Sequence, residues 1–211
     1  MLGDVLLITE KHHKAAKKIF DFVLKNRKVK FLVAISGESG AGKTELAYVL
    51  ARLLKKEGII AKPIHIDNYY KILPLERTEW RKNHGIEKAV GLNEYNWETI
   101  NRNISDFKNN RKSTMPCVDL VTEQLDSLTT DFNGVDMLII DGLYAIKADV
   151  DVRIFIELTY HETKKAQIVR GKEPQNEYRM QVLEREHQVV QSLKQSADLF
   201  VTMDYNVVEK K

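Results

Sequence analysis

The sequence predicts an α/β fold in which a mostly parallel β-sheet carries helices on both faces. Short apolar runs alternate along the chain with longer amphipathic segments, and this alternation is typical of a parallel sheet wrapped by helices. Residues 31–35 are continuously apolar and lead into a glycine-rich loop, as expected of a buried central strand. The apolar run 137–140 similarly ends at an aspartate followed by a glycine.

The first part of the chain contains two predicted helices and two predicted strands. Residues 9–28 should form a helix within an N-terminal lead-in over residues 1–30, because apolar side chains recur there at helical spacing. A second stripe at helical spacing follows the glycine-rich loop and consists of Leu46, Ala47, Leu50, Leu53 and Leu54. Residues 62–66 then form a strand that ends at Asp67.

The second part of the chain is more polar. We expect residues 68–112 to make irregular or helical excursions over the edge of the sheet that would form the active face. Residues 152–158 should form a strand, and residues 199–202 the last one. The segment 160–188 between them is highly charged. No repeat, linker or boundary interrupts residues 1–211, so a single domain is expected.

Composition excludes several classes of protein. The net charge is only +3, with 33 basic and 30 acidic residues, and this balance lacks the basic face of a nucleic-acid-binding protein. Cys117 is the single cysteine, so no internal disulfide is expected. No apolar run approaches the roughly 20 residues that cross a bilayer. We therefore expect a cytoplasmic protein without a membrane or nucleic-acid partner; the sequence leaves a homo-oligomer open.

A phosphate-binding motif, G-x-x-x-x-G-K-[ST], occupies residues 37–44. In this motif the backbone turns tightly and its N–H groups close around phosphate oxygens, at the positive end of the following helix. The expected nucleotide-binding residues are Gly37, Ser39, Gly40, Ala41, Gly42, Lys43 and Thr44. Lys43 would reach the outer phosphates and the Thr44 hydroxyl would bind Mg²⁺. Between a strand and a helix, the motif predicts the three-layer P-loop NTPase fold with ATP and Mg²⁺ as cofactors.

Asp67 and Asp141 each follow a predicted strand, and the carboxyl ends of parallel strands share one edge of a sheet. Asp141 is placed where a second carboxylate supports the metal ion in P-loop enzymes, although an aspartate there could also cap the next turn. Asp67 could accept the proton of an acceptor hydroxyl, or it could be a helix N-cap. The position of Asp67 by itself supports these two roles equally.

With these residues in place, the chain from about residue 31 to residue 201 resembles the uridine kinase and phosphoribulokinase group of P-loop kinases. The resemblance rests on the P-loop and on four further stretches, which are residues 67–71, 141–145, 170–172 and 196–201. Asp67 matches the aspartate that is the catalytic base of that group. Asp141 stands where the group usually has glutamate.

The resemblance also implies a mobile lid over about residues 160–188. Arg170 would be a catalytic cation on this lid, Lys172 would bind the nucleotide, and Arg179 is a further candidate. These cations would neutralise charge on the transferred phosphoryl group. The alternative for each of them is a solvated helical face of paired charges.

The phosphate acceptor is less well defined. Uridine kinases carry a Pro-Val-Tyr-Asp segment and a nearby histidine that hold the nucleobase, whereas residues 116–119 here read Pro-Cys-Val-Asp and no histidine follows shortly after. Residues 93–96 match the ribose-binding motif of the group only loosely. The resemblance thus implies a kinase that transfers the γ-phosphate of ATP to a hydroxyl of a small molecule, which is a nucleoside, a sugar or another hydroxyl compound.

Two alternatives stay open. Adenylylsulfate kinase shares the P-loop architecture, but an aspartate followed closely by arginine is usual there, and residues 69–71 read Tyr-Tyr-Lys. From a different class, the chain could be a nucleotide-dependent switch or assembly ATPase. The sequence lacks the Asn-Lys-x-Asp signature of guanine-nucleotide binding, which argues against a GTPase.

Overall fold

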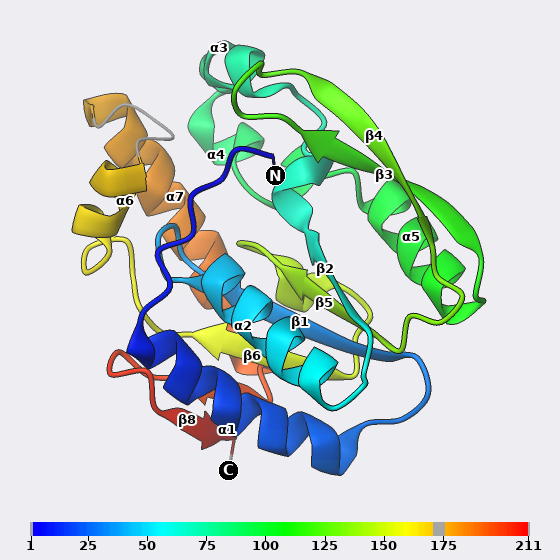
Figure 1. The fold of residues 1–211 in the computed structure, drawn as a ribbon. Helices are drawn as coiled ribbons and strands as arrows, with labels where there is room; N and C mark the ends of the chain where they lie inside the picture. The colour runs from blue at the N-terminus through cyan, green and yellow to red at the C-terminus, as the bar shows by residue number, and fades with distance from the viewer. Residues whose placement is uncertain (1, 171–175, 211) are drawn as a thin grey trace.

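The computed structural model describes residues 2–170 and 176–210, except the side chains of Ala166 and Arg170. Its main sheet has six strands in the order β2-β5-β1-β6-β7-β8 (Figure 1). The strand bounds in that order are Ala61–His65, Met137–Asp141, Phe31–Gly37, Val152–Ile156, Leu199–Val201 and Val207–Glu209. All neighbouring pairs are parallel except β7 and β8, which are antiparallel.

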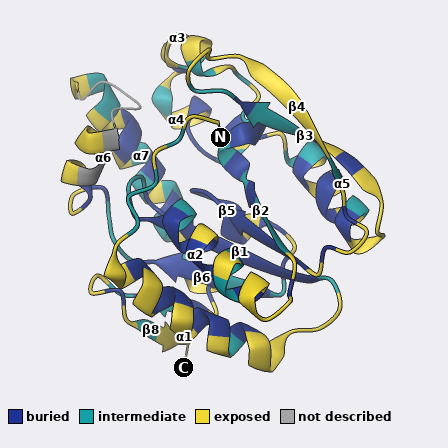
Figure 2. Cartoon of the chain, in the orientation of Figure 1, coloured by how far each residue is buried: buried dark blue, intermediate teal, exposed yellow. Residues whose placement is uncertain are grey.

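Strand β1 lies at the centre of the sheet and is buried along its whole length (Figure 2). Its side chains alternate between two hydrophobic clusters, as the pleat requires. Val33 and Ile35 pack with helices α1 (Glu10–Asn26) and α2 (Lys43–Lys56) on one face. Leu32 and Ala34 pack on the other face with residues of α5 (Trp97–Lys108) and α7 (Glu177–Leu193). Helices on both faces of a mostly parallel sheet confirm the predicted fold class.

Two predictions about strands need correction. Residues 199–202 were expected to form the last strand, but β8 follows β7 after a turn in which Tyr205 adopts a φ of 59°. A hairpin of β3 (Lys112–Val118) and β4 (Leu125–Asp131) was not predicted at all. Strand β4 has no buried residue, so its sequence lacks the apolar alternation from which strands are recognised.

Residues 68–112 were expected to be either irregular or helical, and they are mainly helical. They contain α3 (Pro74–His84), α4 (Ile86–Ala89) and α5, with short 3₁₀ segments η1 (Ile66–Tyr69) and η2 (Leu92–Glu94). The charged region after β6 forms α6 (Lys164–Arg170) and the first part of α7. Two further 3₁₀ segments are η3 (Ala145–Lys147) and η4 (Lys194–Ser196). None of the helices in the described ranges has the length and apolar character needed to traverse a bilayer.

The segment before α1 runs from the sheet to the β3–β4 hairpin (Figure 1). The Leu2 N–H donates to the Val118 carbonyl at 3.0 Å, and the Leu120 N–H donates to the Leu2 carbonyl at 3.2 Å. Further along, the Leu7 N–H donates to Glu45 Oε1 at 3.1 Å. These bonds hold residues 2–7 across the carboxyl edge of the sheet, where the strand-end aspartates lie.

Candidate active site

The phosphate-binding loop connects β1 to α2 and has the backbone that its glycines allow. Gly42 adopts a φ of 82°, and a Cβ atom on it would lie 2.5 Å from both His12 Nε2 and the Tyr205 hydroxyl. Any other residue there would be strained and would collide with α1 and the β7–β8 turn. The Tyr205 hydroxyl also donates to the Ala41 carbonyl at 2.9 Å, and Lys43 Nζ donates to the Glu38 carbonyl at 2.8 Å.

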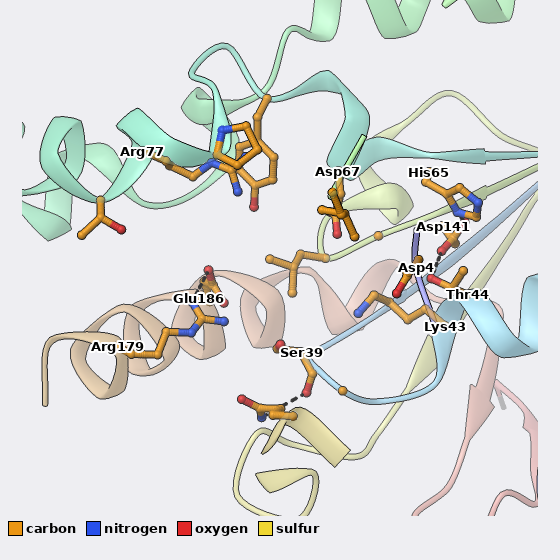
Figure 3. A pocket seen from close by; sticks show the side chains of 18 of the residues that line it. Asp4, Ser39, Lys43, Thr44, His65, Asp67, Arg77, Asp141, Arg179 and Glu186 are labelled. Atoms are coloured by element: carbon orange, nitrogen blue, oxygen red, sulfur yellow. Dashed lines mark hydrogen bonds and ion pairs between the residues drawn. The ribbon is translucent and has the colours of Figure 1, made fainter. Parts of the chain in front are cut away.

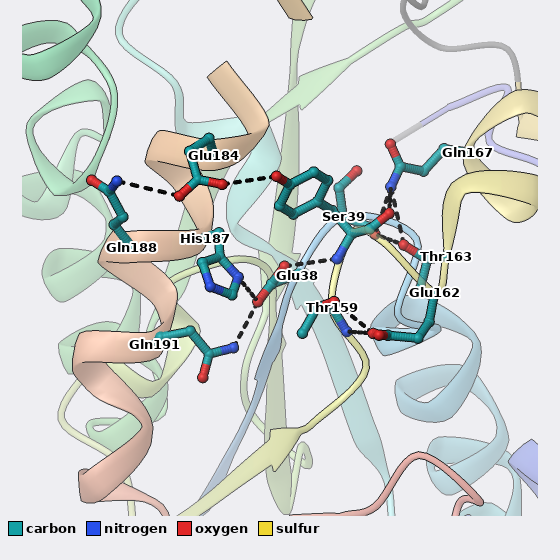
Figure 4. A network of polar contacts seen from close by, with 11 residues as sticks. Glu38, Ser39, Thr159, Glu162, Thr163, Gln167, Glu184, His187, Gln188 and Gln191 are labelled. Atoms are coloured by element: carbon teal, nitrogen blue, oxygen red, sulfur yellow. Dashed lines mark hydrogen bonds and ion pairs between the residues drawn. The ribbon is translucent and has the colours of Figure 1, made fainter. Parts of the chain in front are cut away.

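Glu38 is a buried carboxylate inside this loop, and sequence analysis did not single it out. It accepts hydrogen bonds from the Tyr160 backbone N–H at 2.7 Å, from His187 Nδ1 at 2.7 Å and from Gln191 Nε2 at 2.6 Å (Figure 4). His187 and Gln191 lie on α7. The loop is thereby fixed to α7, and His187 lies within the predicted lid of residues 160–188. An acidic residue within a phosphate-binding loop was the only signal in the sequence.

The α6 side of the loop has its own polar contacts. The Thr163 hydroxyl donates to the Ser39 carbonyl at 2.6 Å, and Gln167 Nε2 donates to the same oxygen at 3.3 Å (Figure 4). Both side chains are buried. The nucleotide loop is therefore supported from two directions by segments that are more than 100 residues distant in sequence, since these bonds span 124 and 128 positions.

Thr44 and Asp141 are brought together, as their predicted metal role requires. The Thr44 hydroxyl donates to Asp141 Oδ2 at 2.8 Å, and His65 Nδ1 contacts the other carboxylate oxygen (Figure 3). Asp141 is only 2% exposed. Mg²⁺ prefers hard oxygen ligands, and it commonly takes one or two from the protein and the rest from phosphates and water. A hydroxyl beside a buried carboxylate fits that requirement, and no cluster of three acidic, histidine or cysteine ligands exists among the described residues to compete with it.

Asp67 lies in the first turn of η1, one residue after Ile66, and the N-cap residue of that segment is His65. Its Oδ1 atom is buried and has no hydrogen-bond partner in the described part of the chain. The geometry therefore gives Asp67 no capping bond and leaves one carboxylate oxygen unused. Sequence analysis had left the base and the cap as alternatives.

One cavity of about 330 Å³ joins these groups. It is lined by Lys43, Thr44, Asp67 and Asp141, the four side chains on which the sequence-based prediction depended (Figure 3). Its volume is at the lower end of the roughly 300–1,000 Å³ found for small-molecule sites. Other lining residues were not predicted, and they include Asp4, His65, Arg77, Arg81 and Glu186.

Arg81 is part of a buried ion-pair cluster at the end of the cavity away from the phosphate loop. Its Nε lies 2.6 Å from Glu94 Oε1, and its Nη2 lies 3.6 Å from Glu186 Oε1. Burial by itself lowers the pKa of Arg81, but Tyr70 and the two carboxylates outweigh burial and raise it overall. Arg81 is thus a permanent cation that joins α3 to α7.

The lid cations are only partly placed. Arg179 lines the cavity, and its Nη1 lies 3.4 Å from Glu186 Oε1. Arg170 ends α6, but its side chain lies outside the described part of the structure, and so does the whole of Lys172. Their roles stay predictions.

The model of the phosphoribulokinase/uridine kinase family matches residues 32–161. The chain is 30% identical over 158 residues to a uridine kinase from Ureaplasma parvum, which covers 72% of this chain and 73% of that protein. The structure of a possible uridine kinase from Bacillus stearothermophilus has a TM-score of 0.66 and 18% identity, covering 89% of this chain and 97% of that one. The structure of phosphoribulokinase from Rhodobacter spheroides has a TM-score of 0.62 and 12% identity, covering 82% of this chain and 70% of that one. Both structures are similar to this chain in fold.

Proposed function

The chain belongs to the phosphoribulokinase/uridine kinase family of phosphotransferases, which act on hydroxyl groups, and on that premise we propose that it transfers the γ-phosphate of ATP to a hydroxyl of a small molecule. The observation that carries this proposal is the unused, buried oxygen of Asp67. It lines the same cavity as Lys43 and the Thr44–Asp141 pair. An acceptor hydroxyl in that cavity would meet a carboxylate on one side and the phosphate loop on the other.

The donor half of the site consists of the phosphate loop and its metal ligands. The loop amides and Lys43 bind the phosphates of ATP, and Thr44 and Asp141 supply oxygen ligands to Mg²⁺. When bound, Mg²⁺ neutralises charge on the β- and γ-phosphates. The contact from His65 keeps the Asp141 carboxylate in one orientation, which is how outer-shell groups support a metal ligand.

The acceptor half begins at Asp67. Its carboxylate accepts the proton of the acceptor hydroxyl as the hydroxyl oxygen forms a bond to the γ-phosphorus, and the bond from that phosphorus to the bridging oxygen breaks to release ADP. Arg170 and Lys172, with Arg179 as a further candidate, are the predicted lid cations that would stabilise charge on the transferred group, and Arg179 also contacts Glu186. Membership of a family of phosphotransferases that act on hydroxyl groups favours transfer to a hydroxyl compound over the alternative of a switch or assembly ATPase. Adenylylsulfate kinase stays an alternative within the same class of reaction.

Uridine is one candidate acceptor, because the Ureaplasma parvum relative is named a uridine kinase. Residues 116–119 lack the tyrosine with which uridine kinases hold the base. We therefore propose the reaction class without a nucleoside preference, and the test begins with a screen.

The test measures ADP formation from MgATP with a panel of nucleosides, sugars, sugar phosphates and hydroxy acids, first for the natural sequence and then for Asp67→Asn. The substitution keeps the shape of the side chain and removes the base. We expect transfer to fall by about 100-fold or more, the usual contribution of a general base. Binding of a fluorescent ATP analogue should stay within about twofold, because the phosphate loop is intact.

A matched control is Asp126→Asn, which changes an exposed aspartate of β4 that does not line the cavity. It should behave as the natural sequence. Transfer by Asp67→Asn at a rate close to that of the control contradicts the base assignment. If no compound in the panel stimulates ADP formation, the kinase proposal itself fails.

A further inference from the structure

Arginines gather at the acceptor end of the cavity, opposite the phosphate loop. Arg77 and Arg81 come from α3, and Arg179 comes from α7. Figure 3 shows Arg77 on one side of this end and the Arg179–Glu186 pair on the other. Two of the three guanidinium groups have carboxylate partners: Arg81 pairs with Glu94 and Glu186, and Arg179 also pairs with Glu186.

Arg77 differs from the other two. Its guanidinium carbon lies 3.6 Å from the centroid of the Tyr70 ring, so it is held against an aromatic face. Its Nε atom is buried and has no hydrogen-bond partner, and the described residues provide it with no ion pair. Tyr70 in turn packs against the buried Tyr95, with ring centroids 4.2 Å apart. Arg77 is therefore fixed in position by stacking, and its charge is left unpaired.

The charge of Arg77 has no counter-charge among the described residues, whereas Arg81 and Arg179 each contact a carboxylate. A partly buried cation without a counter-charge is unfavourable unless a ligand supplies one. Guanidinium groups bind carboxylate and phosphate through two parallel hydrogen bonds, and stacking on a ring leaves their N–H edges available.

From this unpaired guanidinium we propose that the phosphate acceptor carries an anionic oxygen group, a carboxylate or a phosphate, and that Arg77 binds this group. The inference rests on the proposed kinase function. It orients the acceptor along the cavity, with its anionic group at Arg77 and its hydroxyl at Asp67. A compact hydroxy acid or sugar phosphate fits this pattern, whereas a neutral nucleoside or sugar leaves the Arg77 charge uncompensated.

The first experiment compares anionic acceptors with neutral counterparts in the MgATP assay: D-glycerate against glycerol, and ribose 5-phosphate against ribose. A carboxylate preference and a phosphate preference are thereby separated. We expect kcat/KM for one anionic member to exceed that of its neutral counterpart by about 100-fold. Arg77→Gln should raise the KM of that acceptor about 10- to 100-fold with little change in kcat, and Arg77→Lys should restore part of the affinity.

Arg52→Gln is the matched control, because Arg52 also lies over a tyrosine, Tyr48, at 5.8 Å but outside the cavity lining. It should change neither constant. Turnover of a neutral counterpart as efficient as that of the anionic compound overturns the inference while the kinase function stands. An Arg77→Gln variant whose KM for the anionic acceptor stays within about twofold of the natural value overturns it equally.

A binding measurement separates this inference from the kinase proposal. Isothermal titration of D-glycerate and of ribose 5-phosphate into the MgADP-loaded protein tests the anion site with the phosphate loop already filled. Binding of either compound that Arg77→Gln weakens about 10-fold or more supports the inference even if no turnover is found. Equal binding by the two proteins, or no binding of either compound, overturns it.

Discussion

Replacing Glu38 by glutamine should weaken both the fold and the nucleotide site. The carboxylate accepts hydrogen bonds from Tyr160, His187 and Gln191, and its side chain is 2% exposed. A glutamine of the same shape has a single accepting oxygen, and its NH₂ group must face a donor. At least one of these donors, of which the Tyr160 N–H is buried and the other two are partly buried, therefore loses its present acceptor.

The magnitude follows from that loss. A buried donor without a partner costs about 1–3 kcal/mol of stability. Glutamine carries no charge, so the cost of burying a carboxylate disappears, and this gain offsets part of any loss beyond that range. For a chain of this size, about 1 kcal/mol corresponds to a shift of roughly 2–4 °C in Tm. We therefore expect Glu38→Gln to lower Tm by about 2–12 °C. The P-loop should also be less well positioned, so the rise in Tm on adding MgADP should be smaller.

The assay is thermal unfolding followed by circular dichroism, with and without MgADP, supported by urea unfolding at one temperature. Glu209→Gln, an exposed change on β8, is the control. If Glu38→Gln unfolds within about 0.5 kcal/mol of this control, the hydrogen bonds from α7 do not stabilise the loop and the reasoning is wrong.

Two further predictions concern stability. Gly142→Ala should lower the free energy of unfolding by about 2–4 kcal/mol, because Gly142 has a φ of 152° and a Cβ atom would lie 2.1 Å from Ile66 Cγ1. Gly134→Ala, at a φ of 81° with no atom within 4 Å of the added Cβ, should cost only about 1–2 kcal/mol in the same urea experiment; equal losses would disprove the steric argument. Acidification should also destabilise the protein, since the hydrogen bond from the Tyr160 hydroxyl holds the pKa of Glu184 below its ordinary 4.5. The folded state then binds fewer protons than the unfolded state, so this contribution is present above the ordinary pKa and is lost as pH falls through the lower, folded value. The urea midpoint should drop less between about pH 6 and about pH 3 in Glu184→Gln than in the natural sequence, and an unchanged drop would exclude this contribution.

The sequence by itself determined the features that are encoded by contiguous residues. The phosphate loop is one unbroken run, and the buried strands before it and before Asp141 are short apolar runs. Asp67 and Asp141 could be placed on one edge because parallel strands end together, and both line the same cavity. Local pattern and sheet geometry sufficed to predict that these residues lie beside one another.

The β3–β4 hairpin shows where local pattern fails. Its outer strand pairs along its whole length with β3 but buries no side chain, so nothing in residues 125–131 distinguishes it from a loop. Strand β8 was missed for a similar reason: it is short and lies at the edge of the sheet. Backbone pairing stabilises both strands, and backbone pairing leaves no mark on the choice of side chains.

Only the tertiary structure decided how the acceptor end is charged and what holds the phosphate loop. Arg77, Arg81 and Arg179 look alike in sequence, as members of charged helical segments. Two of them contact carboxylates in the fold, while Arg77 has no such partner among the described residues. The partners of Glu38 lie 122 to 153 positions away. Whether a charge is neutralised depends on which distant segments pack beside it, and that information exists only once the chain has folded.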